Sequence, residues 1–402
     1  MTKNDTRGLD LPRLIMQGVN RLGYWTLFCG LLVTAFLKSG VWYFPNLSTY
    51  QVMAKSPFSD LLAQSDPGSA YMYGNWLDAF LAFALGWSDD FWLYFLLHLL
   101  LYLAFVSFVG ATLLRTLPLQ LAKLSLIIFF ILPISNSSLF WVGIDSLTLI
   151  LATGLFAARR SPKIVLSLAV LLGLQSFEQA FVGLLALSVG VLLTIFFSNK
   201  RQLGRSNIHI SRHLSVLQQI LYSPISIALI GVSLGKVLLI LIQLRFGMNA
   251  GGDKGFEVTS NLASLIAEDF YSFQLITWAF LGMGWFVLLR YLALKRNSCA
   301  LAIPLVLLYL VALSVSDQTR VPAVITFPLI GVMWLSDSDF LEGLGETFIG
   351  WLLIAWVVFP YIFVWAGRPQ ESALPANILH FVNVVIGPLF GFSLDDVRWP
   401  FT

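Results

Sequence analysis

Long apolar runs separated by short polar stretches are the dominant pattern of this chain. Many of the runs approach the roughly 20 residues that a helix needs to cross a bilayer core of about 30 Å. The pattern therefore predicts an all-α, polytopic integral membrane protein with about eleven transmembrane helices. We expect these spans near residues 22–43, 91–114, 118–135, 140–158, 164–176, 178–198, 223–244, 270–293, 298–315, 321–336 and 347–366.

The composition supports a membrane protein and argues against a soluble one. The 402 residues are 58% hydrophobic and 11% charged, and their mean hydropathy is +0.82. A soluble protein carries about 25% charged residues. The basic residues are spread over short loops, so no nucleic-acid partner is indicated. Cys29 and Cys299 are not in a metal-ligand spacing, and we expect no disulfide between them.

The charged residues predict the orientation of the chain. Lys3, Arg7 and Arg13 precede the first span and place the N-terminus in the cytoplasm. Most later Lys and Arg residues follow in alternate loops, and most of the 21 acids fall on the opposite, outer face. The acidic loop 337–346 is the exception. Eleven spans place the C-terminus outside, and the predicted location is the bacterial inner (plasma) membrane.

The chain is expected to form a single transmembrane domain over residues 1–402, without internal repeats. The stretch 164–198 is too long for one helix, and Gln175-Ser-Phe-Glu178-Gln179 interrupts its middle, which predicts two short spans joined by a tight outer turn. The end of the first outer loop, Trp76 to Trp87, is apolar but too short to cross, which is typical of an interface helix. Outside the spans we expect a cytoplasmic N-terminus at 1–21, outer loops at 44–90 and 245–269, a cytoplasmic loop at 199–222 and an outer tail at 367–402.

Several ionisable residues lie at or inside the predicted spans, where an unpaired charge is costly. Asp145 is either a hydrogen-bond acceptor at a helix start or a functional acid, and Glu178 is either a solvated turn residue or part of a site. Asp317 and Arg320 are close enough in sequence to form a local ion pair that orders a turn. Lys236 lies mid-run, too deep to reach water easily, and needs an acidic partner or an anionic ligand.

Asp60 is the acid to which we give most weight. It follows the first span in a loop rich in Tyr, Trp, Ser and Gly, where a carboxylate can act as general base for a hydroxyl acceptor. The alternative is that Asp60 and Asp66 only solvate or cap the loop. His98, inside a predicted span, is interpreted as a hydrogen-bonded histidine of the helix bundle. Aromatic residues that suit stacking on sugar rings in the same loop are Tyr50, Tyr71, Tyr73 and Trp76.

This layout resembles that of GT-C-type membrane glycosyltransferases, from the first span to roughly residue 198 and in the outer acids beyond it. The resemblance implies a polyprenyl-phosphate sugar donor and, by position, Asp60 as the catalytic acid of the first loop. The chain departs from that group in two ways. The acid pair usual in the first loop is represented only by Asp60 and Asp66, which are separated by five residues, and a large soluble C-terminal domain is lacking. We expect Arg320, with Lys236 or Arg245, to hold the phosphate, and Glu178, Asp145 and Asp317 to bind sugar hydroxyls or orient the basic groups.

The expected function is transfer of a sugar from a lipid-linked donor to a glycan or lipid acceptor on the outer face. No cofactor is expected, and the sequence leaves open whether a divalent metal takes part. Alternatives are a polysaccharide polymerase or flippase for lipid-linked glycans, a secondary transporter using Asp145, Glu178 and Lys236, and a non-catalytic subunit of a larger membrane complex. A polymerase would rely on outer arginines, of which the chain has few: Arg245, Arg320, Arg368 and Arg398.

Overall fold

A computed structural model of the chain describes residues 10–60, 62, 67–203, 223–248, 272–295, 298–315, 317–359, 361–365 and 368–372. Some of the predicted features lie outside the described residues. These are Asp66, most of the outer loop 245–269, the larger part of the cytoplasmic loop 199–222, and the tail beyond residue 372.

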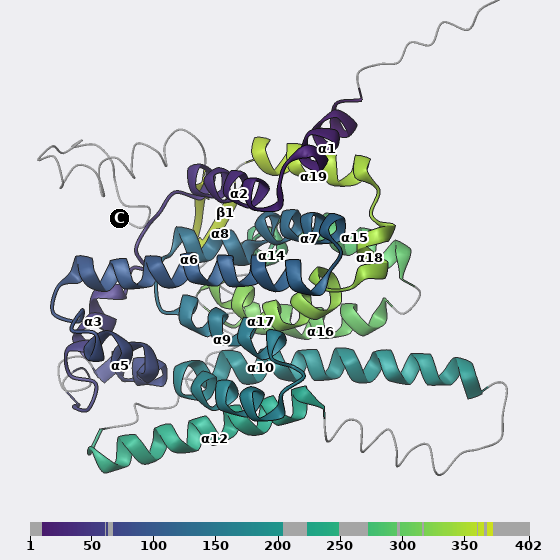
Figure 1. Cartoon of the computed structure of the whole chain (residues 1–402). Coiled ribbons are helices and arrows are strands. Elements are labelled where there is room, and N and C mark those ends of the chain that lie inside the picture. The colour runs from purple at the N-terminus through teal and green to yellow at the C-terminus, as the bar shows by residue number, and fades with distance from the viewer. Residues whose placement is uncertain are drawn as a thin grey trace, which may run out of the picture.

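Helices make up almost all of the described structure, which confirms the predicted helical fold (Figure 1). The one sheet among the described residues is a short antiparallel hairpin of β1 and β2. In chain order the elements are α1 (Leu11–Arg21), α2 (Tyr24–Ser39), α3 (Leu47–Lys55), the 3-10 helix η1 (Pro67–Asn75), α5 (Trp76–Ala84), α6 (Phe91–Thr116), α7 (Leu119–Ile131), α8 (Pro133–Phe140), α9 (Asp145–Ala157), α10 (Pro162–Leu203), α12 (Pro224–Arg245), α14 (Phe273–Leu281), α15 (Gly284–Leu294), α16 (Cys299–Ala312), α17 (Arg320–Ile330), the π-helical η3 (Gly331–Leu335), α18 (Ser338–Gly343), α19 (Glu346–Val358), β1 (Tyr361–Trp365) and β2 (Arg368–Ser372).

Three described helices are long and apolar enough to cross a membrane: α6, the segment Pro162–Phe197 of α10, and α12. Two bent pairs, α7 with α8 and α14 with α15, raise the number to 5 if each pair forms one span. Large apolar side chains of α12, such as Leu234, Val237 and Leu241, are exposed, which suits a lipid surface. The described helices thus have the character of a membrane protein.

This number is below the eleven spans predicted from the sequence. Five further apolar helices are only 10–17 residues long, and hydropathy does not show where a helix ends or breaks. The predicted span 118–135 bends by 49° between α7 and α8, where Pro133 lacks a backbone N–H. The predicted span 270–293 bends by 71° at Gly282, whose φ of 54° favours glycine. The predicted span 347–366 ends early, because α19 stops at Val358 and Tyr361–Trp365 form β1.

The predicted interruption of the stretch 164–198 coincides with a break in α10. Ser176 has φ −163° and ψ 75°, outside the helical region. Before the break, Gly173 meets the backbone of α12 at Val232 and Gly235, so closely that a Cβ would not fit. After the break, Gly183 meets Ile325 of α17 instead. The two halves of α10 therefore pack against different helices, and the break carries Gln175 to Gln179 to the end of the bundle where the first loop lies.

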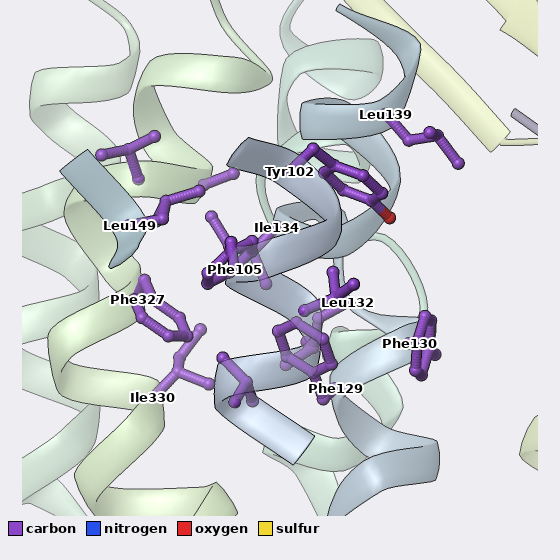
Figure 2. Close-up of a cluster of buried hydrophobic side chains, with 14 of the residues drawn as sticks. Tyr102, Phe105, Phe129, Phe130, Leu132, Ile134, Leu139, Leu149, Phe327 and Ile330 are labelled. Carbon is purple, nitrogen blue, oxygen red and sulfur yellow. The ribbon is translucent and has the colours of Figure 1, made fainter. Parts of the chain in front are cut away.

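The core is built around the bent pair α7–α8, whose buried side chains meet those of α6, α9 and α17 (Figure 2). The bend leaves carbonyl groups at the end of α7 without helical partners. The Asn136 amide donates to the carbonyls of Phe130 and Leu132, at 2.7 and 2.9 Å, and the Ser135 hydroxyl lies 3.0 Å from the Phe129 carbonyl. Side chains of α8 thus satisfy the backbone that the bend frees, as a buried break requires.

The segment expected to form the first outer loop is folded, and α5 covers most of the stretch expected to form an interface helix. The Trp76 indole donates to the Pro57 carbonyl at 2.8 Å, and Phe58 packs edge-on against Trp76 and Phe80. Gln51 of α3 donates to the carbonyls of Ser88 and Asp89, just before α6. In Figure 1, α3 and α5 lie together at one end of α6. These contacts hold the loop against the helix bundle.

The β1–β2 hairpin is hydrogen-bonded to the turn that precedes α17. The Gln318 backbone N–H donates to the Val364 carbonyl at 3.2 Å, and the Val364 N–H donates to the Thr319 hydroxyl at 2.8 Å. Phe363 of β1 stacks on Phe140 of α8 with ring centroids 3.9 Å apart. The hairpin therefore fixes residues 317–320 against the core from one side.

Candidate functional site

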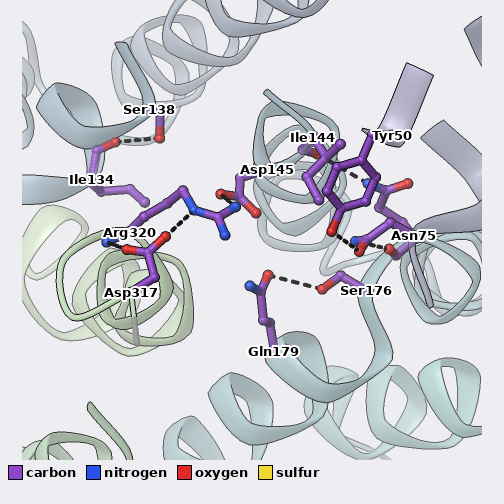
Figure 3. Close-up of polar contacts among 11 residues, drawn as sticks. Tyr50, Asn75, Ile134, Ser138, Ile144, Asp145, Ser176, Gln179, Asp317 and Arg320 are labelled. Carbon is purple, nitrogen blue, oxygen red and sulfur yellow. Dashed lines mark hydrogen bonds and ion pairs between the residues drawn. The ribbon is translucent and has the colours of Figure 1, made fainter. Parts of the chain in front are cut away.

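Asp145, Asp317 and Arg320 form one buried ionic cluster (Figure 3). Arg320 donates from Nη1 to Oδ2 of Asp145 at 2.6 Å and from Nε to Oδ2 of Asp317 at 2.5 Å. Its backbone N–H also donates to Oδ1 of Asp317 at 2.9 Å, which orders the first turn of α17. The expected local pair of Asp317 and Arg320 is thus present, and Asp145, from a distant part of the chain, joins it.

The surroundings of the cluster exclude most water. Arg320, Asp317 and Asp145 keep only 8%, 5% and 4% of their surface exposed. The guanidinium lies over the ring of Phe44, 4.2 Å from its centroid. With both carboxylates ionised, two negative charges face one positive charge. Desolvation makes each of these charges costly unless its partners remain in place.

The two oxygens of Asp145 differ in their partners. Oδ2 accepts from Arg320, whereas the buried Oδ1 has no hydrogen-bond partner within the described residues. A buried carboxylate oxygen normally accepts a hydrogen bond. Asp145 therefore retains the capacity to accept a hydrogen bond from a group that is not part of the described chain.

Gln175, the last helical residue before the break in α10, connects the cluster with the first loop. Its amide donates to the Ile144 carbonyl at 3.1 Å, next to Asp145, and its side-chain oxygen accepts from the backbone N–H of Asp78 at 2.9 Å. The Asn75 amide donates to the Gln175 carbonyl at 2.7 Å. Gln175 is fully buried, so α5, α9 and α10 are joined through one side chain.

Tyr50 of α3 lies beside this connection and is buried. Its hydroxyl approaches Oδ1 of Asn75 at 3.4 Å. Burial, and next the neighbouring Tyr71 hydroxyl, raise the pKa of the Tyr50 phenol well above its usual value. Tyr50 therefore stays protonated at neutral pH and acts as a hydrogen-bond donor.

Asp78, Tyr94 and His98 form a second buried polar group that the sequence did not indicate. The Tyr94 hydroxyl donates to Oδ2 of Asp78 at 3.0 Å, and Nε2 of His98 lies 3.0 Å from the same oxygen. Nδ1 of His98 lies 2.7 Å from the Tyr94 carbonyl, which can only accept, so Nδ1 carries a proton. His98 is thus a hydrogen-bonded bundle residue, as interpreted from the sequence.

Asp60 is half-buried and lies at the end of the turn formed by residues 56–59. The Tyr73 hydroxyl donates to the Ser59 carbonyl at 3.0 Å and accepts from the backbone N–H of Leu62 at 3.1 Å, on both sides of Asp60. Tyr73 is 1% exposed, so it supports the loop, and its ring face is not open to a sugar as the sequence suggested. Tyr71 is half-buried. The ion pairs around Arg320 do not include Asp60.

Lys236 finds the acidic partner that its position requires. Its Nζ lies 2.9 Å from Oε1 of Glu178, just beyond the break in α10, and 5.4 Å from the centroid of the Phe177 ring. Glu178 also approaches Gly74 of the first loop. The side chains of Lys236 and Glu178 remain 31% and 67% exposed, so this pair is partly exposed, unlike the cluster around Arg320.

Arg245, at the end of α12, is exposed and lies near the turn that carries Asp60. Its guanidinium is 5.9 Å from the centroid of the Phe246 ring. Phe246 in turn contacts Phe58, with centroids 4.8 Å apart, and Phe58 precedes Asp60 by two residues. The end of α12 thus brings a solvent-accessible cation to the part of the first loop that holds Asp60.

Within the described residues, no group of three or more His, Cys, Asp or Glu side chains is placed to hold a metal ion. Comparison with protein-family models, curated proteins and solved structures finds no match for this chain.

Proposed function

We propose that this protein is a membrane glycosyltransferase that moves a sugar from a polyprenyl-phosphate carrier to a glycan or lipid acceptor on the outer face. The predicted topology of eleven spans, cytoplasmic N-terminus and outer C-terminus belongs to this proposal. The observation that carries it is the convergence of the first loop, the start of α9, the break in α10 and the start of α17. Gln175 connects the first three, and the Arg320–Asp145 pair connects α17 to α9. A folded loop resting on a buried ionic cluster is a rigid platform on which an acceptor and a lipid-linked donor can meet.

Asp60 is the proposed general base. The acceptor hydroxyl attacks the anomeric carbon of the donor sugar and forms the new glycosidic bond. The bond between that carbon and the phosphate oxygen breaks, and polyprenyl phosphate leaves with the electron pair. Asp60 takes the hydroxyl proton, a role that suits a half-buried carboxylate in a loop fixed on both sides by Tyr73.

The proposed phosphate ligand is Arg245, at the end of α12, with Lys236 as a second cation earlier on the same helix. Arg320 is neutralised by two buried carboxylates, which makes its surroundings unfavourable for an added anion. Arg320 instead orients Asp145 and Asp317. The unpartnered Oδ1 of Asp145 is then the proposed acceptor for a sugar hydroxyl.

The alternative function, a secondary transporter, would need Asp145, Glu178 and Lys236 to lie along one path for the transported ion or substrate. Glu178 and Lys236 pair with each other in a partly solvated position, while Asp145 pairs with Arg320 in a buried one. The three residues thus belong to two separate ion pairs, which favours the transferase.

The test is donor turnover by Asp60→Asn protein in membrane vesicles supplied with a panel of polyprenyl-phosphate sugars. Release of free polyprenyl phosphate is the readout, because this product is the same whichever acceptor in the membrane vesicles takes the sugar. We expect a loss of about 100-fold or more, the contribution typical of a general base. The matched control is Asp89→Asn, since Asp89 is an exposed acid whose side chain is outside this network. Full turnover by the Asp60 variant would refute the assignment of the base, and absence of turnover by the unmodified protein with every donor would refute the proposed function.

A further inference from the structure

A cavity of about 370 Å³ lies between α6, α9, α10, α12 and α17, away from the first loop. Its volume falls within the range of roughly 300–1,000 Å³ that small-molecule sites occupy. Both halves of α10 contribute to its wall, with Val165 and Leu172 before the break and Leu184 and Leu187 after it. The cavity wall therefore includes α10 on both sides of the break at Ser176.

The wall of the cavity is almost entirely apolar along its length. Leu149, Ala152, Ala228 and Phe327 are among the residues that line it. At one end lie Thr148 and Gln179, one helical turn from Asp145 and three residues from the break. An apolar cavity of this kind suits a hydrocarbon chain, since it offers few hydrogen-bond partners.

The opposite end of the cavity is marked by polar residues at the ends of helices. Thr116 ends α6, Ser336 follows η3, and Arg159 follows α9. Arg159 is exposed and makes no ion pair within the described chain. Its guanidinium lies 4.3 Å from the centroid of the Phe156 ring and donates to the Phe156 carbonyl at 3.2 Å, which holds it at the cavity mouth. Arg160 and Lys163, also exposed, add positive charge nearby.

Charge decides which end receives a head group. The end near Asp145 borders a cluster with two carboxylates and one guanidinium, which disfavours an anion. At the Arg159 end, the acid that follows Ser336, Asp337, is paired with Lys295. Arg159 makes no ion pair within the described residues, and a guanidinium binds phosphate well. We infer that this cavity holds an acyl chain of an anionic glycerophospholipid, with its phosphate at Arg159, taken from the leaflet on the Arg159 side of the membrane. This site goes beyond the proposed transferase, whose donor binds at the opposite face.

The test uses the full chain reconstituted in phosphatidylcholine vesicles with a trace of photoreactive phosphatidylglycerol, whose acyl chain carries a diazirine. A phosphatidylcholine with the same diazirine chain is the comparison probe. After illumination, the labelled peptides are mapped by mass spectrometry. We expect the anionic probe to label Ala152 and Ala228 about fivefold more than the neutral probe, since one basic residue near a phosphate gives a ratio of about that size.

Two variants separate the head-group contact from the cavity. Arg159→Ala should reduce labelling of Ala152 and Ala228 by the anionic probe to the level of the neutral probe, whereas the matched control Arg160→Ala should not. Ala228→Phe should fill part of the cavity and reduce labelling of Ala152 by both probes, while labelling of the exposed Leu234 and Leu241 on α12 shows that the protein remains folded. Equal labelling of the cavity by both probes, or labelling confined to the exposed face of α12, would overturn the proposal. Neither result depends on glycosyl transfer.

Discussion

The ion pairs of Arg320 and Lys236 have the same kinds of neighbours but differ in burial. Each cation pairs with an acid from a distant part of the chain, Asp145 or Glu178, and each lies near a phenylalanine ring. Arg320 has only 9% of its side chain exposed and Lys236 has 31%. Exposure decides which charge is structural and which is available to a ligand.

The difference follows from the elements that surround each cation. Arg320 begins α17 beneath the β1–β2 hairpin and faces the start of α9, so protein encloses it. Lys236 lies on α12, a helix with many exposed apolar side chains and one main packing partner, α10. A buried charge cannot lose its partner without a large cost, whereas a partly solvated charge can exchange its partner for water or an anion.

The largest effect is expected for Arg320→Met. This change leaves Asp145 and Asp317 buried without a counter-charge, and breaking a buried pair in this way costs about 3–5 kcal/mol. We expect a large fall in the thermal unfolding midpoint of the detergent-solubilised protein, or no folded protein at all. An unfolding midpoint equal to that of the unmodified protein would show that the cluster does not stabilise the fold.

An intermediate effect is expected for Gln175→Leu. The change removes the acceptor for the Asp78 backbone N–H and the donor to the Ile144 carbonyl, and each buried group left without a partner costs about 1–3 kcal/mol. Protection of α5 in hydrogen-exchange measurements should fall more than protection of α16. The control is Gln179→Leu, because Gln179 is half-buried and its side chain only accepts from the Ser176 hydroxyl. Equal effects of the two changes would contradict the central position given to Gln175.

The smallest effect is expected for Lys236→Met, the counterpart of Arg320→Met. A solvated pair contributes about 0–1 kcal/mol, so the unfolding midpoint should change little, and what change there is should shrink at high salt. If this variant were destabilised as strongly as the Arg320 variant, burial would not explain the difference between the two pairs.

The sequence predicted part of this arrangement. The local pair of Asp317 and Arg320 and the interruption of the helix at Gln175 to Gln179 were expected, since each depends on local sequence pattern. The contact between Arg320 and Asp145 was not predictable, because it depends on how α9 and α17 pack. Asp78 gave a weak signal, a single acid in the apolar run from Trp76 to Trp87, and its partner His98 lies on another helix.

The number of spans shows that hydropathy alone does not predict where an apolar helix is divided. An apolar run was counted as one crossing wherever it was long enough, but Pro133, Gly282 and the strand after Val358 divide three of these runs. Backbone continuity depends on these positions and on whether side chains such as Asn136 can satisfy the freed carbonyls. The hydrophobic pattern alone carries little of that information.

The role of the buried ionic cluster is tested most directly by a double-mutant cycle between Arg320 and Asp145, measured by the thermal unfolding midpoint. If Arg320 serves as the internal counter-charge, Arg320→Met should destabilise the protein strongly, because it leaves two buried carboxylates without a partner, whereas Asp145→Leu should destabilise it less, because Arg320 keeps Asp317. The double variant should then be much less destabilised than the sum of the two, because it leaves Asp317 as the one unpaired charge. Additive effects would show that the two residues act independently, and would contradict the buried cluster as the support of the first outer loop and of the site we assign to it.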